Sequence, residues 1–414
     1  MADDIADRTD GTIETDVVIV GAGPAGAAAA MTLARAGLRA TILDKAIFPR
    51  DKFCGDGLTV WTLRQLDEMG LDPATVPSWR VVKQAVLISP SGREVLLPLP
   101  ERGTFCAVAR RSELDAAVLD IAREAGAEVL TGQECTSLAQ GDDRVRVATS
   151  TGMTVVGRYL IAADGMWSTV RKLTGTGIEG YRGEWHAFRQ YFEGVTGRAQ
   201  DEMLAWFEPD FLPGYAWSFP VGNNEANVGF GIMRGGSWRV GAMRELWAEI
   251  SSRPHIRAAL GPGAAPEGPP RAWPIPARVG EVPLSCGRVL FTGDAAAAAD
   301  PLTGEGIGQA YATGRWAADA IIRCGASVGE PMVADRYESS VRSSLFRDHQ
   351  MSALLNRALS HRKGARTAIW LVSLSPWTRR NFARWLFEDY PRAMLATPRR
   401  WHHGMFSGPG AFGP

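Results

Sequence analysis

The sequence lacks several features that would assign a protein to a class at once. No run of apolar residues approaches the roughly 20 that a membrane-spanning helix needs, so we expect no transmembrane segment. The 5 cysteines contain no CxxC pair, which argues against a zinc or other metal site and against a disulfide framework. Lys plus Arg and Asp plus Glu are balanced at 45 each, so nothing favours nucleic-acid binding. The polar start Met1–Thr12 lacks the pattern of a secretory signal, and we expect a cytoplasmic protein.

Hydrophobic patterning predicts a βαβ start followed by mixed elements. A buried strand over Glu14–Val20 leads into a Gly-rich turn, an Ala-rich helix to Ala36 and a second strand over Leu38–Leu43. A further helix follows Ser112, whose hydroxyl we expect to cap it. The other predictions are a strand over Ala127–Leu130, two strands within 144–163, an antiparallel meander over 183–233, a surface loop over Gly261–Pro270, a strand at Leu290–Phe291, a helix over Gly304–Cys324 and a mostly helical tail from Val333.

Gly21-Ala22-Gly23-Pro24-Ala25-Gly26 is a GxGxxG motif directly after a predicted strand and at the start of a predicted helix. The first glycine permits a tight turn, the second lets the backbone approach a pyrophosphate, and the third lets the helix pack on the strand. The pyrophosphate would face the free amides at the positive end of the helix. Asp44 ends the second strand, where a carboxylate accepts hydrogen bonds from ribose hydroxyls and repels a 2′-phosphate. The motif therefore predicts FAD or NAD as the ligand and argues against NADP.

Two later motifs favour FAD. Ala163-Asp164-Gly165 resembles the Asp-Gly motif of class A flavoprotein monooxygenases and their relatives, and the segments 293–296 and 300–306 resemble the second flavin fingerprint of the same superfamily. The resemblance implies that Asp294 binds the ribityl chain and that the amides of Gly304–Gly306 face the pyrimidine edge of the flavin. It also implies that Arg111 contacts FAD. The residues that we expect to bind FAD are Gly21, Gly23, Ala25, Gly26, Asp44, Lys45, Arg111, Asp164, Asp294, Pro301, Gly304, Gly306 and Ile307.

Two further segments resemble the geranylgeranyl reductase family, which includes reductases of archaeal lipids, of plant prenyl chains and of the menaquinone side chain. The first is Phe48–Leu58, Phe-Pro-Arg-Asp-Lys-Phe-Cys-Gly-Asp-Gly-Leu, and the second is Pro213–Pro220, which contains a YxWxFP pattern and is followed by Asn227–Gly231. The resemblance implies that the YxWxFP stretch helps to line a lipid cavity and that Cys54 lies beside the flavin.

Tyr215, Trp217 and Phe219 alternate along one predicted strand, so their rings project to the same face. From the residues alone this face is either core or one wall of a cavity; the chain's 14 Trp are equally compatible with both. The family resemblance favours the wall and makes these three residues the substrate-binding candidates. An isolated cysteine is more often a buried inert residue, whereas the resemblance makes Cys54, together with Tyr215, a catalytic candidate.

We therefore expect an FAD-dependent oxidoreductase that reduces isoprenoid double bonds of a prenyl lipid, quinone side chain or terpenoid. The alternative is an NAD(P)H-dependent FAD monooxygenase that hydroxylates or epoxidises an apolar natural product. Asp300 keeps this alternative open, because many reductases of the family have Asn before the following proline. A flavin-binding protein without redox turnover is a third hypothesis. The sequence has no second dinucleotide fingerprint, so NAD(P)H would reduce the flavin transiently at its face.

The tail is strongly basic, with nine Lys or Arg and two acidic residues between His361 and His403. Ser375-Pro376 predicts a helix start, and the residues Phe382, Trp385, Leu386, Arg379, Arg380 and Arg384 follow within that helix. The segment is either a helix packed on the substrate domain or a peripheral membrane contact. The expected partner is an apolar small molecule, and the sequence indicates no oligomeric state.

The patterns and the resemblance together predict an α/β fold: a discontinuous Rossmann-like FAD-binding domain, an inserted antiparallel-sheet substrate domain and a helical C-terminal region. The FAD-binding domain is assigned to 1–75, 105–178 and 285–330. The substrate-binding domain is assigned to 76–104 and 179–284, and the helical region to 331–414.

Overall fold

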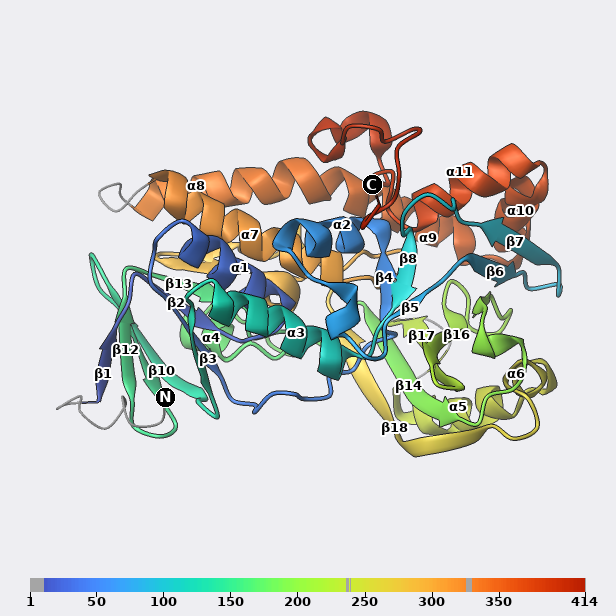
Figure 1. Ribbon diagram of the computed structural model, residues 1–414, viewed down its shortest axis with the longest axis horizontal. Coiled ribbons are helices and arrows are strands. Elements are labelled where there is room, and N and C mark those ends of the chain that lie inside the picture. The colour runs from blue at the N-terminus through green and yellow to red at the C-terminus, as the bar shows by residue number, and fades with distance from the viewer. Residues whose placement is uncertain (1–10, 236–237, 239, 325–329, 414) are drawn as a thin grey trace.

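The computed structural model describes residues 11–235, 238, 240–324 and 330–413. Residues 1–10, which carry most of the polar start discussed above, lie outside this range. The described chain forms an α/β sheet at one end and a larger antiparallel sheet at the other, and the C-terminal helices extend across both (Figure 1). The predicted fold class is confirmed.

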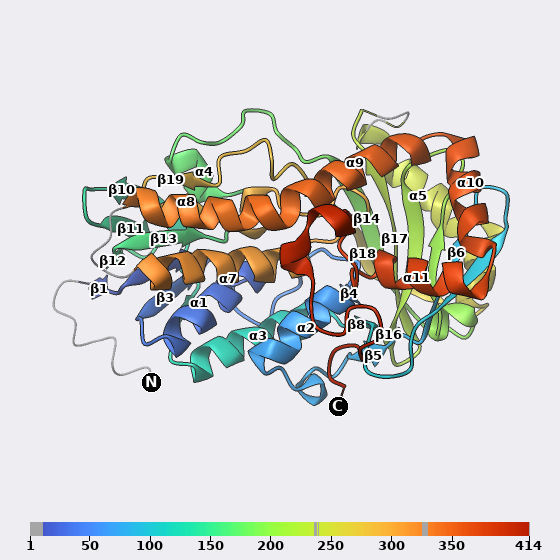
Figure 2. The same cartoon turned by 90° about the horizontal axis from the view of Figure 1, so that it is seen from above.

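The α/β sheet is assembled from segments that lie far apart in the sequence. Its order is β19-β20-β13-β2-β3-β9, and β2, β3, β9, β13 and β20 run parallel. Helix α8 lies along α7 over this sheet (Figure 2). The elements are β2 (Val17–Val20), β3 (Ala40–Asp44), β9 (Glu128–Thr131), β13 (Tyr159–Ala162), β19 (Ser285–Cys286), β20 (Val289–Phe291), α1 (Pro24–Arg35), α3 (Arg111–Glu124), α4 (Thr169–Leu173), α7 (Ile307–Cys324) and α8 (Glu330–Val341).

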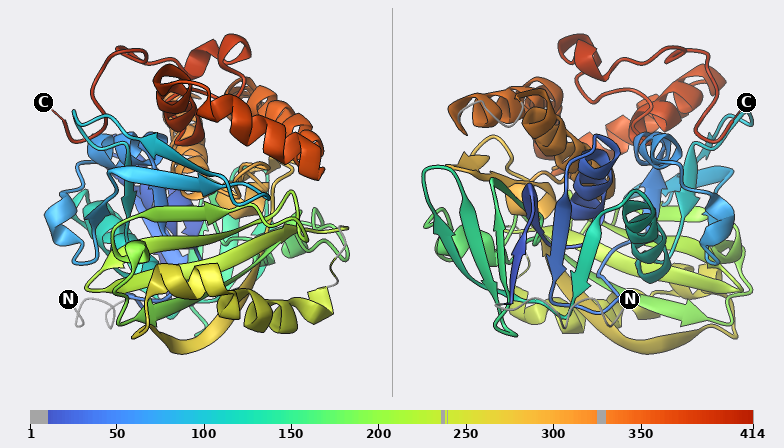
Figure 3. Two further views of the ribbon diagram at one scale, coloured as in Figure 1. Left: turned by 90° about the vertical axis from the view of Figure 1, so that its right-hand side faces the viewer. Right: turned by 60° about the vertical axis from the view of Figure 1, so that its left-hand side comes forward.

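The second sheet has seven strands in the order β18-β14-β17-β16-β15-β6-β7. Only the β15–β6 pair is parallel, so the predicted antiparallel pattern over 183–233 is confirmed. Helices α5 and α6 cover one face, and α9, α10 and α11 lie over the other (Figure 3). The elements are β6 (Gln84–Ile88), β7 (Glu94–Pro98), β14 (Trp185–Glu193), β15 (Met203–Trp206), β16 (Tyr215–Gly222), β17 (Glu225–Met233), β18 (Ala265–Ile275), α5 (Met243–Ser252), α6 (Pro254–Leu260), α9 (Arg347–Leu359), α10 (Arg362–Ser373) and α11 (Pro376–Leu386).

Two small sheets complete the described structure. A three-stranded sheet, β4-β8-β5, stands between the two large sheets, and helix α2 directly follows its strand β4. A four-stranded sheet, β1-β12-β11-β10, lies at the end of the molecule next to the α/β sheet (Figure 1). These elements are β4 (Gly57–Thr59), β5 (Arg80–Val81), β8 (Cys106–Val108), α2 (Val60–Met69), β1 (Thr12–Glu14), β10 (Cys135–Gln140), β11 (Val145–Thr149) and β12 (Thr154–Gly157).

Three local predictions were wrong. The expected strand over Glu14–Val20 is divided between β1 and β2, which belong to different sheets. Ser112 does not cap α3, because the helix already begins at Arg111. The N-cap residue is Arg110, whose amide donates to Ser78 Oγ at 2.8 Å. The expected loop over Gly261–Pro270 is largely strand β18, which tolerates its prolines because it is an edge strand with one unpaired side.

Candidate active site

A cavity of about 890 Å³ is lined by residues of both large sheets. One end is lined by Asp44 and Lys45 at the end of β3, and the middle by Gly21 and Asp294. The other end lies beneath the C-terminal helices, where Ile369 belongs to the wall. The cavity therefore joins the GxGxxG turn to a distant apolar space.

The GxGxxG turn is shaped for close backbone packing on one side and for a ligand on the other. A Cβ at Gly21 would lie 2.3 Å from the carbonyl oxygen of Ala163, and a Cβ at Gly26 would lie 1.8 Å from that of Gly21. At Gly23 the nearest atom would be Arg50 Nη2 at 3.6 Å, and this residue faces the cavity. Gly23 thus leaves room where a pyrophosphate can meet the N-terminus of α1.

The start of α7 forms a second cradle in the same cavity. The nearest atom to a Cβ at Gly304 would be Ile275 Cδ1 at 3.3 Å, and the nearest to a Cβ at Gly306 would be Ala299 Cβ at 3.5 Å. Asp294 lies beside this cradle, because its Oδ1 would be 3.8 Å from a Cβ at Gly306. Two glycine cradles at two helix N-termini, one with a carboxylate beside it, fit the pyrophosphate and the flavin of one FAD molecule.

The structure brings most of the predicted cofactor residues to this cavity. Those in its wall are Gly21, Gly23, Ala25, Asp44, Lys45, Arg111, Asp164, Asp294, Gly304, Gly306 and Ile307. Gly26 is instead packed beneath the turn, and Pro301 is buried with its carbonyl accepting a hydrogen bond from Trp185 Nε1 at 2.8 Å.

Several of these polar side chains are already engaged by their own chain. Asp164 accepts hydrogen bonds from Ser168 Oγ at 2.6 Å and from the Val170 amide at 3.0 Å, so it binds the N-cap residue and the first turn of α4. Asp44 accepts the amides of Ala22 at 2.7 Å and Ala46 at 2.8 Å. Both carboxylates thus fix the loops from which the cavity wall is built.

Arg111 is a buried cation held in a rigid position. Its Nε and Nη2 donate to the two carboxylate oxygens of Asp115, each at 2.8 Å. This bidentate pair keeps the pKa of Asp115 below its usual value despite burial. The guanidinium therefore remains charged in the wall of the cavity.

The loop that carries Cys54 is anchored by one asparagine. Asn227 Nδ2 donates to the carbonyl oxygen of Cys54 at 2.9 Å and to Asp56 Oδ2 at 2.8 Å, while Asn227 Oδ1 accepts from Trp217 Nε1 at 3.1 Å. Tyr191 donates to the same Asp56 oxygen at 2.6 Å. Asn227 thus ties the Cys54 loop to the aromatic strand β16.

Burial sets the protonation of this loop. It raises the pKa of the Cys54 thiol to about 11, so the thiol is neutral at ordinary pH. Burial also raises the pKa of Asp56 to about 6, against the hydrogen bonds and the Arg189 charge that favour its ionised form. Neighbouring Lys52 lies 3.8 Å from the centre of the Trp273 ring, and burial lowers its pKa to about 8.

The rings of Tyr215, Trp217 and Phe219 all line the cavity, on the face of the sheet that α9–α11 cover. Gly229 lies directly opposite Trp217 on β17, where an added Cβ would stand 2.3 Å from the indole ring. The tyrosine hydroxyl donates to the carbonyl oxygen of Thr303 at 2.6 Å. Tyr215 therefore connects this aromatic wall to the loop before α7.

Beyond the aromatic wall the cavity becomes entirely apolar. One side is formed by strands β6 and β15 and the other by helices α9–α11, and the wall there includes Ala85, Leu87, Ala205, Leu355, Leu359, Ala365, Ala368, Ile369, Val372, Phe382, Trp385 and Leu386. Phe382, Trp385 and Leu386 were predicted to share a helix, but their part in a cavity was not predicted. Arg384, one of the basic residues of the same helix, is buried and donates through Nε and Nη2 to Asp389.

Comparison with known proteins gives a consistent picture. A model of the FAD binding domain family matches residues 14–340. A menaquinone reductase of Mycobacterium tuberculosis is 32% identical over 351 residues, which cover 78% of this chain and 80% of that protein. A digeranylgeranylglycerophospholipid reductase of Methanopyrus kandleri is 32% identical over 327 residues, which cover 75% and 81%. The crystal structure of a geranylgeranyl bacteriochlorophyll reductase-like protein from Thermoplasma acidophilum superposes with a TM-score of 0.76 at 22% identity, covering 94% of this chain and all of that one.

Proposed function

Because this chain belongs to the geranylgeranyl reductase family of FAD-dependent oxidoreductases, we propose that it reduces carbon–carbon double bonds in the isoprenoid chain of a lipid or quinone. The observation that carries the proposal is the apolar extension of the cavity beyond the aromatic wall. Sheet strands line it on one side and α10 and α11 on the other. A long hydrocarbon chain fits such a space, since each buried CH₂ contributes about 0.8 kcal/mol.

In this proposal the two glycine cradles, Asp294 and Arg111 hold FAD, and the aromatic strand orients the isoprenoid. Bound FAD supplies the hydride for the reduction. Reduction of a double bond also needs a proton at the second carbon, and the neutral Cys54 thiol is the donor that we assign to it. Tyr215 positions the loop at Thr303, because its hydroxyl is engaged there.

The domains expected from the sequence can be matched to FAD binding and to substrate binding. We propose that 1–75, 105–178 and 285–330 bind FAD and that 76–104 and 179–284 form the substrate domain. The helical region 331–414 then contributes the second side of the apolar space, through α9, α10 and α11.

Product mass tests the reaction. The holoenzyme is supplied with NADPH or NADH as reductant and with a geranylgeranyl-bearing lipid or quinone. We expect products heavier by two hydrogen atoms for each double bond reduced. A product heavier by one oxygen atom would identify a monooxygenase and overturn the reductase assignment. Retention of oxidised FAD and unchanged lipid with either reductant, and also with dithionite, would exclude redox turnover of this lipid class.

We also propose that the outer surface of α9–α11 contacts a membrane that contains the substrate. No helix of the described chain is long and apolar enough to cross a bilayer. The outer surface nevertheless exposes large apolar side chains, with 68% of Trp377 and 55% of Leu374 accessible. The same surface includes Leu354, Trp370 and Leu371, and the cations beside it are Arg362, Lys363, Arg366, Arg379 and Arg380.

The positive charge of this segment favours a membrane with anionic lipids as the partner. From His361 to Phe387 the sequence has no Asp or Glu, so these cations have no acidic neighbour along the segment. Exposed tryptophan and leucine next to arginine and lysine are typical of helices that lie in a lipid interface. A lipid substrate could then pass from the bilayer to the apolar end of the cavity, on the inner side of the same helices.

Vesicle sedimentation tests this contact. The protein should pellet with phosphatidylglycerol-containing vesicles at low salt and less at high salt, because salt screens the attraction. Trp370→Ser with Trp377→Ser should abolish pelleting and leave FAD content unchanged. Trp238→Ser, far from this surface on the other side of the second sheet, serves as the control. No pelleting of the wild-type protein at low salt would refute the membrane contact.

A further inference from the structure

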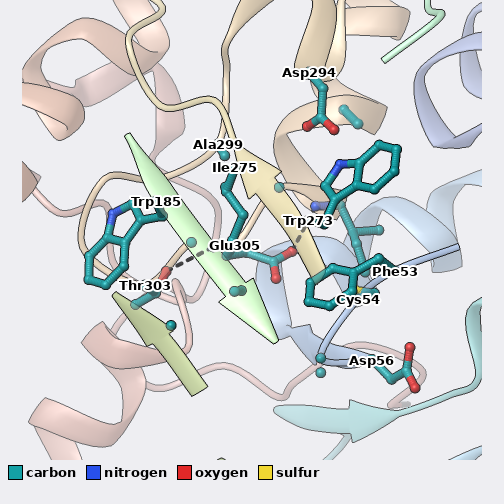
Figure 4. Close-up of a pocket in the computed structure, with 18 of the residues that line it drawn as sticks. Phe53, Cys54, Asp56, Trp185, Trp273, Ile275, Asp294, Ala299, Thr303 and Glu305 are labelled. Atoms are coloured by element: carbon teal, nitrogen blue, oxygen red, sulfur yellow. Dashed lines mark hydrogen bonds between the residues drawn. The ribbon is translucent and has the colours of Figure 1, made fainter. Parts of the chain in front are cut away.

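Glu305 places a carboxyl group in the cavity at the start of α7. Its Oε1 accepts hydrogen bonds from the amides of Ile307 at 3.0 Å and Gly308 at 3.2 Å and from Thr62 Oγ1 at 3.3 Å. Its Oε2 makes no hydrogen bond with the part of the chain that the structure describes. Figure 4 shows the side chain reaching from the loop of Thr303 towards Phe53 and Cys54. One oxygen is thus fixed by the protein and the other is available to the contents of the cavity.

A chain of hydroxyl groups connects Glu305 to a second buried carboxyl group. Thr62 Oγ1 lies 3.1 Å from Thr59 Oγ1, which lies 3.0 Å from Glu388 Oε2. A hydroxyl group both donates and accepts, so rotation of the two threonine hydroxyls lets one proton reside at either end. The three links, from Glu305 through Thr62 and Thr59 to Glu388, form a continuous proton connection.

Glu388 is held in place at some conformational cost. It is buried and adopts a φ of 60°, which is uncommon for a residue with a long side chain. Its other oxygen accepts from Gln309 Nε2 at 3.2 Å and lies 3.9 Å from Arg400 Nη2. Glu388 is not among the residues that line the cavity, so its carboxyl group lies behind the wall and does not contact a ligand inside.

The surroundings of Glu305 favour the protonated form of its carboxyl group. Burial and the nearby Glu388 raise its pKa to about 7, and the pKa of Glu388 is raised as well. The other titratable groups that face it are Cys54, Cys106, Tyr215 and Tyr311, and burial raises the pKa of each further above neutrality. In the same cavity wall, the pKa of Asp56 is about 6, burial lowers the pKa of Lys52 to about 8, and burial raises the pKa of Asp164.

We propose that Glu305 takes up a proton when the FAD of this enzyme is reduced, and that Thr62, Thr59 and Glu388 share this proton with it. Two-electron reduction brings one proton to the cofactor and leaves a negative charge in the cavity that Glu305 faces. A second proton from solvent then forms an O–H bond on Glu305, so that two like charges are avoided. The inference rests on FAD-dependent redox chemistry and not on the identity of the substrate.

The midpoint potential of the bound flavin, measured against pH with dithionite as the electron donor, tests the proposal. One additional proton for two electrons changes the equilibrium constant tenfold per pH unit, which corresponds to about 30 mV per pH unit. The wild-type holoenzyme should show this additional slope above about pH 7, where Glu305 is ionised in the oxidised enzyme. Glu305→Gln should lack it. A wild-type slope in Glu305→Gln would overturn the proposal, and so would loss of the slope in Asp56→Asn alone.

Variants away from the cavity test the shared proton. Glu388→Gln removes the repulsion that raises the pKa of Glu305, so the onset of the additional slope should move to lower pH. Thr62→Val removes a donor to the ionised form and should move the onset to higher pH, and Thr62→Ser should restore it. Glu68→Gln on α2, which removes an exposed carboxylate paired with Arg315, should match the wild type. An unchanged onset in both Glu388→Gln and Thr62→Val would refute the sharing.

A direct measurement covers the case in which Glu305→Gln does not retain FAD. The reduced-minus-oxidised infrared difference spectrum of the wild-type protein, and that of the Glu68→Gln control, should show the carbonyl band of a newly protonated carboxyl group. Thr62→Val should shift the frequency of this band, because the carboxyl group of Glu305 then loses its hydrogen bond with Thr62 Oγ1. The absence of any such band in the wild-type protein would overturn the proposal, even if the protein reduces isoprenoids normally.

Discussion

At the scale of single residues, two glycines of one turn serve different purposes. A Cβ at Gly26 would overlap the backbone of Gly21, so position 26 needs glycine for the fold itself. A Cβ at Gly23 would meet no backbone atom and would point into the space that we assign to the pyrophosphate. A substitution at each position therefore separates the stability of the fold from binding of the cofactor.

We expect Gly23→Ala to fold and to lose FAD. The variant should unfold at nearly the same temperature as the wild-type apoprotein, because the added methyl group has room. Its FAD affinity should fall at least tenfold, which is about 1.4 kcal/mol. Gly26→Ala should instead lower the unfolding temperature of the apoprotein. Calorimetry and the flavin-to-protein absorbance ratio would check both, and a stable, FAD-saturated Gly23→Ala protein would contradict the assignment.

The raised pKa of Asp56 predicts that the stability of the fold depends on pH. Its pKa rises from 3.8 in the unfolded chain to about 6 in the folded one, so the folded state binds more protons between these values. Stability from this group is therefore highest below about pH 4 and falls as pH rises through 6, by about 3 kcal/mol in total. Asp56→Asn should remove this part of the pH dependence in denaturant titrations of the holoenzyme.

The exposed Asp201→Asn variant is the control for that measurement, because its carboxylate lies at the surface in a pair with Arg80. If Asp56→Asn and the wild type lose stability equally between pH 4 and pH 7, the raised pKa is not the cause.

The residues whose place in the cavity wall could be predicted from sequence are those that lie close together along the chain. The GxGxxG turn and Asp44 could be predicted because strand, turn and helix follow one another directly. The importance of Asp56 and Glu305 could not, although both stand within recognisable motifs. Asp56 meets Tyr191 across 135 residues of chain, and Thr59 meets Glu388 across 329. No pattern in a single sequence indicates such pairs, so the electrostatics of the cavity had to come from the structure.

At the scale of elements, α10 separates the cavity from the exterior. Ile369 and Val372 face inward, whereas Trp370 and Leu371 are exposed. A helix with apolar residues on two faces gives an ambiguous periodicity. The sequence could therefore predict a helical tail, but not that α10 forms part of the cavity wall. The start of α11 could be predicted from Ser375-Pro376, because proline favours the first helical position. The structure adds a capping box between Ser375 and Thr378.

We expect Ala368→Trp on α10 to shorten the substrate space. Ala368 lies in the apolar wall, so an indole ring there should block the far end of a long isoprenoid. Turnover of geranylgeranyl substrates should fall more than tenfold, while a substrate with one or two isoprene units and the FAD content should be little affected. Product analysis across a chain-length series would measure this.

The neighbouring Thr367 is exposed on the same helix, so Thr367→Trp is the matched control for helix propensity and added bulk. If Ala368→Trp lowers turnover of long and short substrates equally, the far end of the isoprenoid does not lie at Ala368. The same conclusion would follow if Thr367→Trp showed the selective loss for long substrates.

At the scale of the whole molecule, one cavity is built from both large sheets. The α/β sheet supplies Gly21 and Asp294, while Trp185 and Trp273 come from β14 and β18 of the second sheet. The order of strands made it possible to predict two sheets, but the way they face each other depends on buried contacts such as Trp185 with the carbonyl of Pro301. A ligand that fills the cavity should therefore stabilise both sheets at once.

Comparison of FAD with ADP tests this arrangement, because ADP carries the same adenosine and pyrophosphate without a flavin. At a free concentration of 100 times its dissociation constant, either ligand should stabilise the apoprotein by about 2.7 kcal/mol. Hydrogen exchange should distinguish them. Both ligands should slow exchange in the turn before α1, but only FAD should protect Trp273–Ile275 on β18 and Thr303–Ile307 before α7, because only the flavin reaches the far cradle. Equal protection of these two segments by ADP would mean that the sheets are coupled without the flavin between them, and the placement of FAD across both glycine cradles would then be wrong.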